Sequence, residues 1–211
     1  MSGISYSIDV DEAAVKDAVS AFEFVGGNIG DAMRIAINKS ALKVKTLASR
    51  EIRKQVRLSA AYVSLRLAVT KATRNRLSGA IKTPSRGVLL SRFSTDAVIA
   101  LDGGGWTHPP PIPTRGIRIK IKPDGKTTGA PGVGTNKPFY IVLNKGQNVG
   151  IAARTGTDRK GIKVFSGPSL SQVFNTVRGD VLPAASTEYQ AQLLDAMRYL
   201  LVKKYPPEEV T

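Results

Sequence analysis

The sequence predicts an α+β fold in which an antiparallel sheet packs against a long N-terminal basic helix and C-terminal helices. Three observations predict it. A long stretch near the N-terminus has apolar residues at helical spacing, the middle contains short segments of alternating apolar and polar residues, and the last quarter returns to helical spacing. With 211 residues, the chain can bury about 70% of its unfolded surface. We therefore expect a single domain over residues 1–211.

The first thirty residues predict a strand followed by a short helix. Residues 4–10 alternate apolar and polar side chains, which is the pattern of a half-buried strand. Asp11 suits the N-cap of a helix, and the Gly26–Gly27 pair is a typical helix end.

The strongest pattern in the sequence is a long helix over residues 28–57, which would be about 45 Å long. Its apolar residues form one stripe: Met33, Ile37, Ala41, Val44, Ala48 and Ile52. Five basic residues lie within about 60° of one another, and their centre is roughly 145° from the centre of the stripe. We call these five residues the basic ridge: Lys39, Lys43, Arg50, Lys54 and Arg57. With the stripe buried, Ala41→Asp would place an unpaired carboxylate in the core at a cost of about 3 kcal/mol or more.

The middle of the chain predicts short strands, one further helical turn at 59–62, and two long loops. Alternation and β-branched residues indicate strands over residues 65–70, 80–81, 88–93, 117–121, 139–143, 149–153 and 162–165. In the strand over 117–121 the isoleucines alternate with basic residues, so its outer face is basic. The loops span 102–113 and 124–137, which are rich in Gly and Pro and lack periodicity.

Two helices are expected at the C-terminal end. Pro168 suits the first turn of a helix that carries Val173, Phe174 and Val177. A last helix is expected over residues 181–204, where apolar residues again follow three- and four-residue steps.

The charge of the chain favours an anionic partner. Lys and Arg number 31 against 16 Asp and Glu, a net charge of +15 that is concentrated in residues 28–165. The basic ridge has no interleaved acids, which favours a polyanion over a merely solvated face. Because no helix-turn-helix, zinc-finger or RNA-binding signature is present, contact with a nucleic-acid backbone is expected in preference to base readout. Docking on the acidic first 27 residues of a neighbouring copy is the alternative.

Several kinds of chemistry are excluded or disfavoured. The chain has no Cys and a single His, His108, which excludes thiolate chemistry and multi-histidine metal sites. The Gly-rich segment 129–137 has the spacing of a P-loop, but Thr135 stands where the loop requires Lys. We therefore expect no enzyme, no cofactor and no metal site. Trp106 is the only Trp and either anchors a partner or folds back onto its own sheet. The apolar runs are too short to span a bilayer, so no membrane contact is expected.

Short segments occur in a distinctive order over residues 30–203. They read AINKSA at 36–41, TLASR at 46–50, SGAI at 78–81, LLSRF at 89–93, RGIRI at 115–119, KPFYI at 137–141, ARTG at 153–156 and SGPS at 166–169. In this order and spacing the chain resembles the phage minor tail protein Z family, the tail completion proteins of long-tailed phages.

The resemblance implies a structural virion protein, assembled in the host cytoplasm, that completes the tail at the head–tail junction. It also implies a homo-oligomeric ring, commonly six-fold, around the DNA channel, with no catalytic residues. The implied partners are the tail terminator, the tail tube, the head-completion proteins and phage DNA. We expect the loops 102–113 and 124–137 to become ordered against neighbouring subunits or the tail tube, with Trp106 as an interface candidate. A tail terminator that caps the tube, a free nucleic-acid-binding protein and a small enzyme using the loop 129–137 remain as alternatives.

Overall fold

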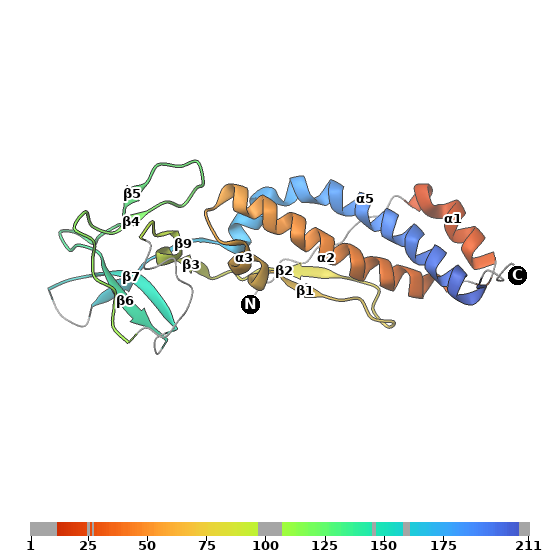
Figure 1. Ribbon diagram of the computed structural model, residues 1–211, viewed down its shortest axis with the longest axis horizontal. Coiled ribbons are helices and arrows are strands. Elements are labelled where there is room, and N and C mark those ends of the chain that lie inside the picture. The colour runs from red at the N-terminus through yellow and green to blue at the C-terminus, as the bar shows by residue number, and fades with distance from the viewer. Residues whose placement is uncertain are drawn as a thin grey trace, which may run out of the picture. The chain divides into compact units, whose positions relative to one another are not determined.

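The computed structural model describes residues 12–24, 26, 28–96, 107–144, 147–157 and 161–206, and it confirms the α+β class (Figure 1). The helices in this part of the chain are α1 (Glu12–Phe24), α2 (Ile29–Gln55), α3 (Ala60–Arg66), the short 3-10 helix η1 (Leu90–Phe93) and α5 (Leu170–Lys204). The strand expected over residues 4–10 lies outside the described residues.

The strands in the described ranges are short and all pair antiparallel, but they form four small sheets where the sequence suggested one. The two-stranded sheets join β1 (Ala68–Thr70) to β2 (Ala80–Lys82), β3 (Gly87–Leu89) to β9 (Ser166–Ser169), and β4 (Arg118–Ile119) to β5 (Thr128–Gly129). The three-stranded sheet has the order β6 (Phe139–Leu143), β7 (Asn148–Arg154) and β8 (Ile162–Val164).

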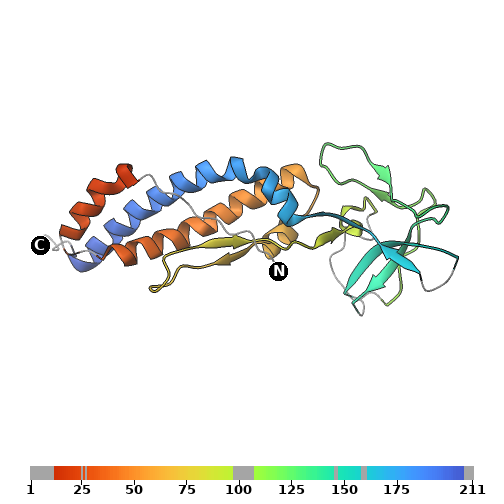
Figure 2. The ribbon, with the colours of Figure 1, turned by 180° about the vertical axis from the view of Figure 1, so that it is seen from behind.

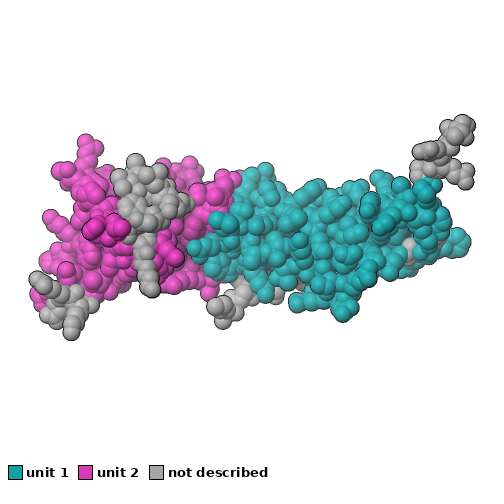
Figure 3. All heavy atoms as spheres, turned by 60° about the horizontal axis from the view of Figure 1, so that its bottom comes forward, with its two compact units in different colours: residues 1–51, 63–84, 174–211 teal, residues 52–62, 85–173 magenta. Residues whose placement is uncertain are grey.

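The chain divides into two compact units, which Figure 3 shows in different colours. Unit 1 consists of residues 1–51, 63–84 and 174–211, and unit 2 consists of residues 52–62 and 85–173. Each unit is therefore assembled from segments that are distant in the sequence.

In unit 1, helices α2 and α5 run side by side in opposite directions, and α1 packs against them (Figures 1 and 2). Their shared core consists of Phe22, Ala32, Ala36, Tyr189, Leu193, Ala196 and Met197. The alanines have no side chain beyond Cβ, so the helix backbones can approach closely at these positions. Helix α2 begins where the sequence predicts, because the Asn28 side-chain oxygen accepts a hydrogen bond from the Asp31 backbone N–H at 3.2 Å.

The apolar stripe of α2 is confirmed. Ala41, Val44, Ala48 and Ile52 are buried, while Met33 and Ile37 are half-buried. The helix ends at Gln55, two residues before the predicted end.

The β1–β2 hairpin of unit 1 is held on α2 by the Asn38 side chain and by an ion pair in which Nε of Arg74 lies 3.6 Å from Oδ1 of Asp31. The Asn38 amide donates to the Ala72 carbonyl at 3.1 Å, and the Asn38 oxygen accepts from the Ala72 N–H at 2.8 Å. Gly79 lies so close to the helix that a Cβ there would be 2.8 Å from Cγ2 of Ile37. A larger residue at this position would therefore force the hairpin or the Ile37 side chain to shift.

In unit 2, the core lies around β7 and η1. Five consecutive residues of β7 are buried, and Phe93 of η1 is fully buried. The Ser91 hydroxyl donates to the Val149 carbonyl, which joins η1 to β7. The Tyr140 hydroxyl donates to Asp96, and burial followed by this hydrogen bond raises the Tyr140 pKa.

Four sequence predictions of local structure are wrong. Pro168 lies in strand β9 and not in the first turn of a helix, and residues 65–66 belong to α3 and not to the strand expected over 65–70. Residues 170–204 form one continuous helix instead of two, with Pro183 inside it. Val177, Val181 and Ala185 are all buried, so packing on both sides holds the helix through the proline. Residues 90–93 belong to a 3-10 helix and not to the strand expected over 88–93.

Candidate interface: basic residues of helix α2 and of the β4–β5 hairpin

All five residues of the basic ridge are exposed, as the periodicity of α2 predicts. They do not belong to one structural unit, because Lys39, Lys43 and Arg50 fall in unit 1 whereas Lys54 and Arg57 fall in unit 2. Arg57 also lies beyond the last residue of the helix.

Lys43 is engaged within its own unit. Its Nζ lies 2.6 Å from Oε1 of Glu188 on α5, and the Gln192 amide donates to the same oxygen at 2.9 Å. The hydrogen bond from Lys43 is the main reason why the pKa of Glu188 lies below its ordinary value. Lys43 therefore links α2 to α5, although 59% of its side chain is exposed.

We expect the Lys43–Glu188 pair to make the stability of unit 1 depend on pH in the acid range. A carboxyl group whose folded pKa lies below the ordinary 4.5 stabilises the fold above that pH, and this contribution is lost as the pH falls through the folded value. Glu188→Gln should remove this dependence at a cost of less than about 1 kcal/mol near neutral pH, because the pair is partly exposed.

Urea unfolding between about pH 7 and pH 3 measures this effect. Asp195→Asn, which changes an exposed acid on the same helix, is the matched control and should keep the pH dependence. Identical pH profiles for the original chain and Glu188→Gln would contradict the assignment.

The other ridge residues differ in their surroundings. Nε of Arg50 lies 3.4 Å from Oε1 of its neighbour Glu51. The Arg57 guanidinium donates to the Ser94 carbonyl at 3.2 Å, so it holds unit 2 together. Lys39 is exposed and forms no ion pair with the residues that the structure describes.

A second group of basic residues lies on the β4–β5 hairpin of unit 2. We call residues 115–130 the basic arm, which contains Arg115, Arg118, Lys120, Lys122 and Lys126 with Asp124 as its single acid. The exposed fractions of Ile117 and Ile119 are 2% and 5%, whereas Arg118 between them is exposed. The predicted basic outer face is therefore confirmed at Arg118, whereas Lys120 is half-buried, the strand is shorter than predicted, and its pairing with β5 was not predicted.

Most of the excess positive charge belongs to unit 2. Its residue ranges contain sixteen Lys and Arg against four Asp and Glu, a net charge of +12. The ranges of unit 1 contain fifteen Lys and Arg against twelve Asp and Glu, a net charge of +3. The linear sequence does not reveal this division because both units are discontinuous.

The loops that the sequence singled out are only partly described. Trp106 lies outside the described residues, as do residues 102–105. In the remainder of the first loop, Ile112 has 51% of its surface exposed. The second loop contains β5 and a bridge between Val133 and Asn136, with Gly134 at φ 55°.

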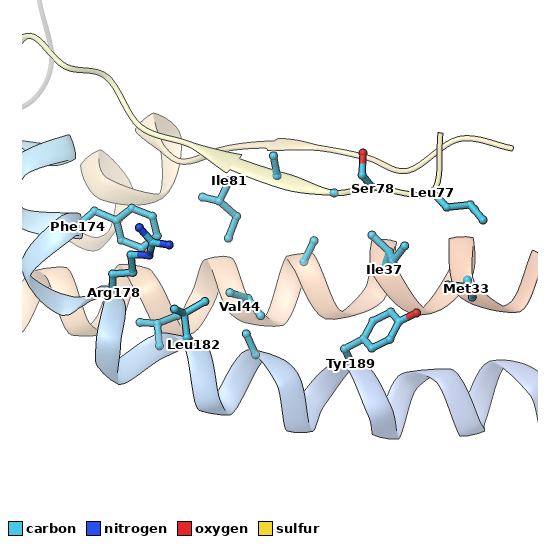
Figure 4. A pocket seen from close by; sticks show the side chains of 15 residues that line it. Met33, Ile37, Val44, Leu77, Ser78, Ile81, Phe174, Arg178, Leu182 and Tyr189 are labelled. Carbon is cyan, nitrogen blue, oxygen red and sulfur yellow. The ribbon is translucent and has the colours of Figure 1, made fainter. Parts of the chain in front are cut away.

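Unit 1 contains an apolar cleft of about 230 Å³ between the β1–β2 hairpin and helices α2 and α5. In Figure 4, Phe174 and Arg178 lie at one end of it, and Met33 and Leu77 lie at the other. Its lining is apolar apart from Arg178, Ser78 and the Tyr189 hydroxyl, so it suits apolar contact and not acid–base chemistry.

The described ranges contain no group of three or more His, Cys, Asp or Glu residues that could bind a metal ion. None of the helices in these ranges is long and apolar enough to cross a bilayer.

Comparison with known protein families identifies a match over most of the chain. The family described as prophage minor tail protein Z (GPZ) matches residues 14–204. No curated protein and no solved structure matches the chain.

Proposed function

The chain belongs to the prophage minor tail protein Z family, whose match covers residues 14–204 of 211, and we propose that it completes the phage tail at the head–tail junction. As a minor tail protein it is a structural component of the virion. In this proposal, copies of the chain form a ring around the DNA channel, and we expect six copies in the ring. The two units of each copy act together as one tail-completion domain without a catalytic role.

The observation that carries the ring proposal is an exposed apolar surface on unit 1. Phe24 at the end of α1 is 92% exposed, and Val202 and Tyr205 near the end of α5 are each 57% exposed. These three residues line one shallow hollow, and we call them the apolar tip. Exposed apolar residues that gather in one patch are typical of protein–protein contact surfaces.

Two alternative functions remain. A tail terminator that caps the tube would use the same apolar tip against the tube instead of a neighbouring copy. A free nucleic-acid-binding protein is favoured by the net charge of +12 on unit 2. Whether the chain forms a ring at the junction or a terminator on the tube, the basic ridge would face either DNA or the acidic first 27 residues of a neighbouring copy of the chain.

We expect Phe24→Asp to convert the ring into monomers, because a charge at the centre of an apolar contact must be desolvated on assembly. Native mass spectrometry of the full chain, alone and with the tail terminator and tail tube proteins, measures the change. Leu65→Asp is the matched control, since Leu65 is also in unit 1 and is 83% exposed. A chain that is monomeric in every mixture would contradict the ring.

A virion reconstruction distinguishes the remaining alternatives. We expect density for the chain between the tail and the head-completion proteins. Density only at the end of the tube would favour the terminator, and virions without the chain would favour a free nucleic-acid-binding protein.

A further inference from the structure

We propose that the basic arm contacts the phosphate backbone of duplex DNA. The inference rests on the proposed function in one respect: DNA must pass the place where the chain assembles. It goes further by choosing between the two roles left open for the basic ridge: the phosphate contact belongs to the β4–β5 hairpin, and the ridge residues Lys39, Lys43 and Arg50 do not make it.

Four of the five basic residues of the arm are exposed, and Lys120 is half-buried. Ile117 and Ile119 are buried, while Arg118 and Lys122 are exposed. The hairpin is closed by pairing of Arg118 with Gly129 and of Ile119 with Thr128. Because side chains on a strand point alternately to opposite faces, Arg118 of β4 lies on the face opposite the buried Ile119. Lys120 and Lys122 follow the strand, and Lys122 lies in the bend that leads to the turn.

The base of the arm is held by backbone hydrogen bonds within unit 2. The Thr95 N–H donates to the Arg118 carbonyl at 3.0 Å, and the Lys120 N–H donates to the Phe93 carbonyl at 2.8 Å. On the other side, the Arg57 N–H donates to the Ile121 carbonyl at 2.7 Å. The basic residues therefore project from a fixed ribbon, which lowers the entropy that binding must offset.

The exposed residues of the arm suit phosphates better than an acidic protein. Besides Arg118 and Lys122, the exposed residues of the arm include Lys126, Thr127, Thr128 and Gly129. They offer ammonium, hydroxyl and backbone N–H groups that can donate hydrogen bonds to phosphate oxygens. Protein–protein interfaces are commonly centred on apolar or aromatic anchors. The arm has no aromatic residue, its isoleucines at 117 and 119 are buried, and Ile121 is half-buried.

The three ridge residues of unit 1 are less suited to this contact. Lys43 pairs with Glu188 at 2.6 Å and Arg50 lies 3.4 Å from Glu51, so two of the three cations already face carboxylates. A phosphate would have to compete with these acids. The same three residues supply a control with an equal change in net charge.

Binding of a short fluorescent DNA duplex to the full chain, followed by anisotropy at several salt concentrations, tests the proposal. The arm variant carries Arg118→Gln, Lys120→Gln and Lys122→Gln, and the ridge variant carries Lys39→Gln, Lys43→Gln and Arg50→Gln. Each lost phosphate contact lowers the salt slope by about 0.9. We expect the arm variant to lose about two to three in slope and tenfold or more in affinity near 0.1 M salt, and the ridge variant to lose less than about threefold.

Equal losses in both variants would show that net charge alone drives binding and would overturn the assignment. Absence of DNA binding by the unaltered chain would also overturn the assignment. Displacement of the duplex by polyglutamate of equal charge would overturn it as well, because it would indicate an acidic protein as the partner. An unchanged melting temperature of both variants confirms that they are folded. If the arm variant melts at a lower temperature, the DNA-binding measurement is repeated with Lys126→Gln, which changes an exposed residue of the arm. The proposed tail role fails separately, through a virion reconstruction that lacks the chain.

Discussion

Ala36→Asp is expected to destabilise unit 1 by about 3 kcal/mol or more, enough to unfold a marginally stable protein. Ala36 has no exposed surface. It belongs to the core that α1, α2 and α5 form together, which also contains Phe22 of α1 and Leu193 of α5. A carboxylate there has neither water nor a cation to pair with, and the closely packed helices leave no room for its extra atoms. Thermal and urea unfolding, followed by helical circular dichroism, measure the loss.

Two substitutions on the same helix serve as controls. Leu42→Asp changes a residue that is 52% exposed and should alter the unfolding free energy by less than about 0.5 kcal/mol. Ala41→Asp should fall between the two, below the cost of about 3 kcal/mol that the buried stripe alone suggests. Ala41 lines the apolar cleft, where a carboxylate can reach solvent more easily. If Ala36→Asp and Leu42→Asp were equally stable, the three-helix packing would be refuted.

Phe93→Ala is expected to destabilise unit 2 by about 3–5 kcal/mol, the usual cost of truncating a buried aromatic residue. Phe93 is fully buried in η1 and lies against the backbone of β9. A Cβ on Gly167 would be only 2.7 Å from Cε2 of the Phe93 ring. Removal of the ring therefore opens a cavity beneath the β3–β9 pair. Hydrogen exchange by mass spectrometry should show protection lost in peptides of unit 2 and retained in those of unit 1.

The close contact between Phe93 and Gly167 supplies an internal check. Gly167→Ala alone should be destabilising because its methyl group meets the ring, but in the Phe93→Ala background the clash is absent. The two changes together should therefore cost less than the sum of their separate effects. Phe139→Ala, which truncates a half-buried aromatic of the same unit, should cost less than Phe93→Ala. Simple additivity of Phe93→Ala and Gly167→Ala would contradict the packing described for η1 and β9.

The sequence by itself determined those features that depend on neighbours a few residues away. The apolar stripe of α2 and its Asn28 cap follow from helical spacing, and the strands at Phe139–Leu143 and Asn148–Arg154 follow from β-branched and apolar runs. The exposure of the basic ridge follows in the same way. The ordered short segments were also sufficient to indicate the family.

Tertiary structure decided what depends on residues far apart in the chain. Helix α5 continues through Pro183 because buried residues on both sides hold it, and residues 166–169 form a strand only because Gly87 and Leu89 pair with them. The same holds for the candidate site. Helical spacing predicts that Lys43 is exposed but cannot show that Glu188, 145 positions later, pairs with it. Two further features arise only when discontinuous segments fold together: the positive charge of unit 2 and the hydrogen bond that joins the basic arm to the backbone of Arg57. Local propensity carries no information about such non-local partners.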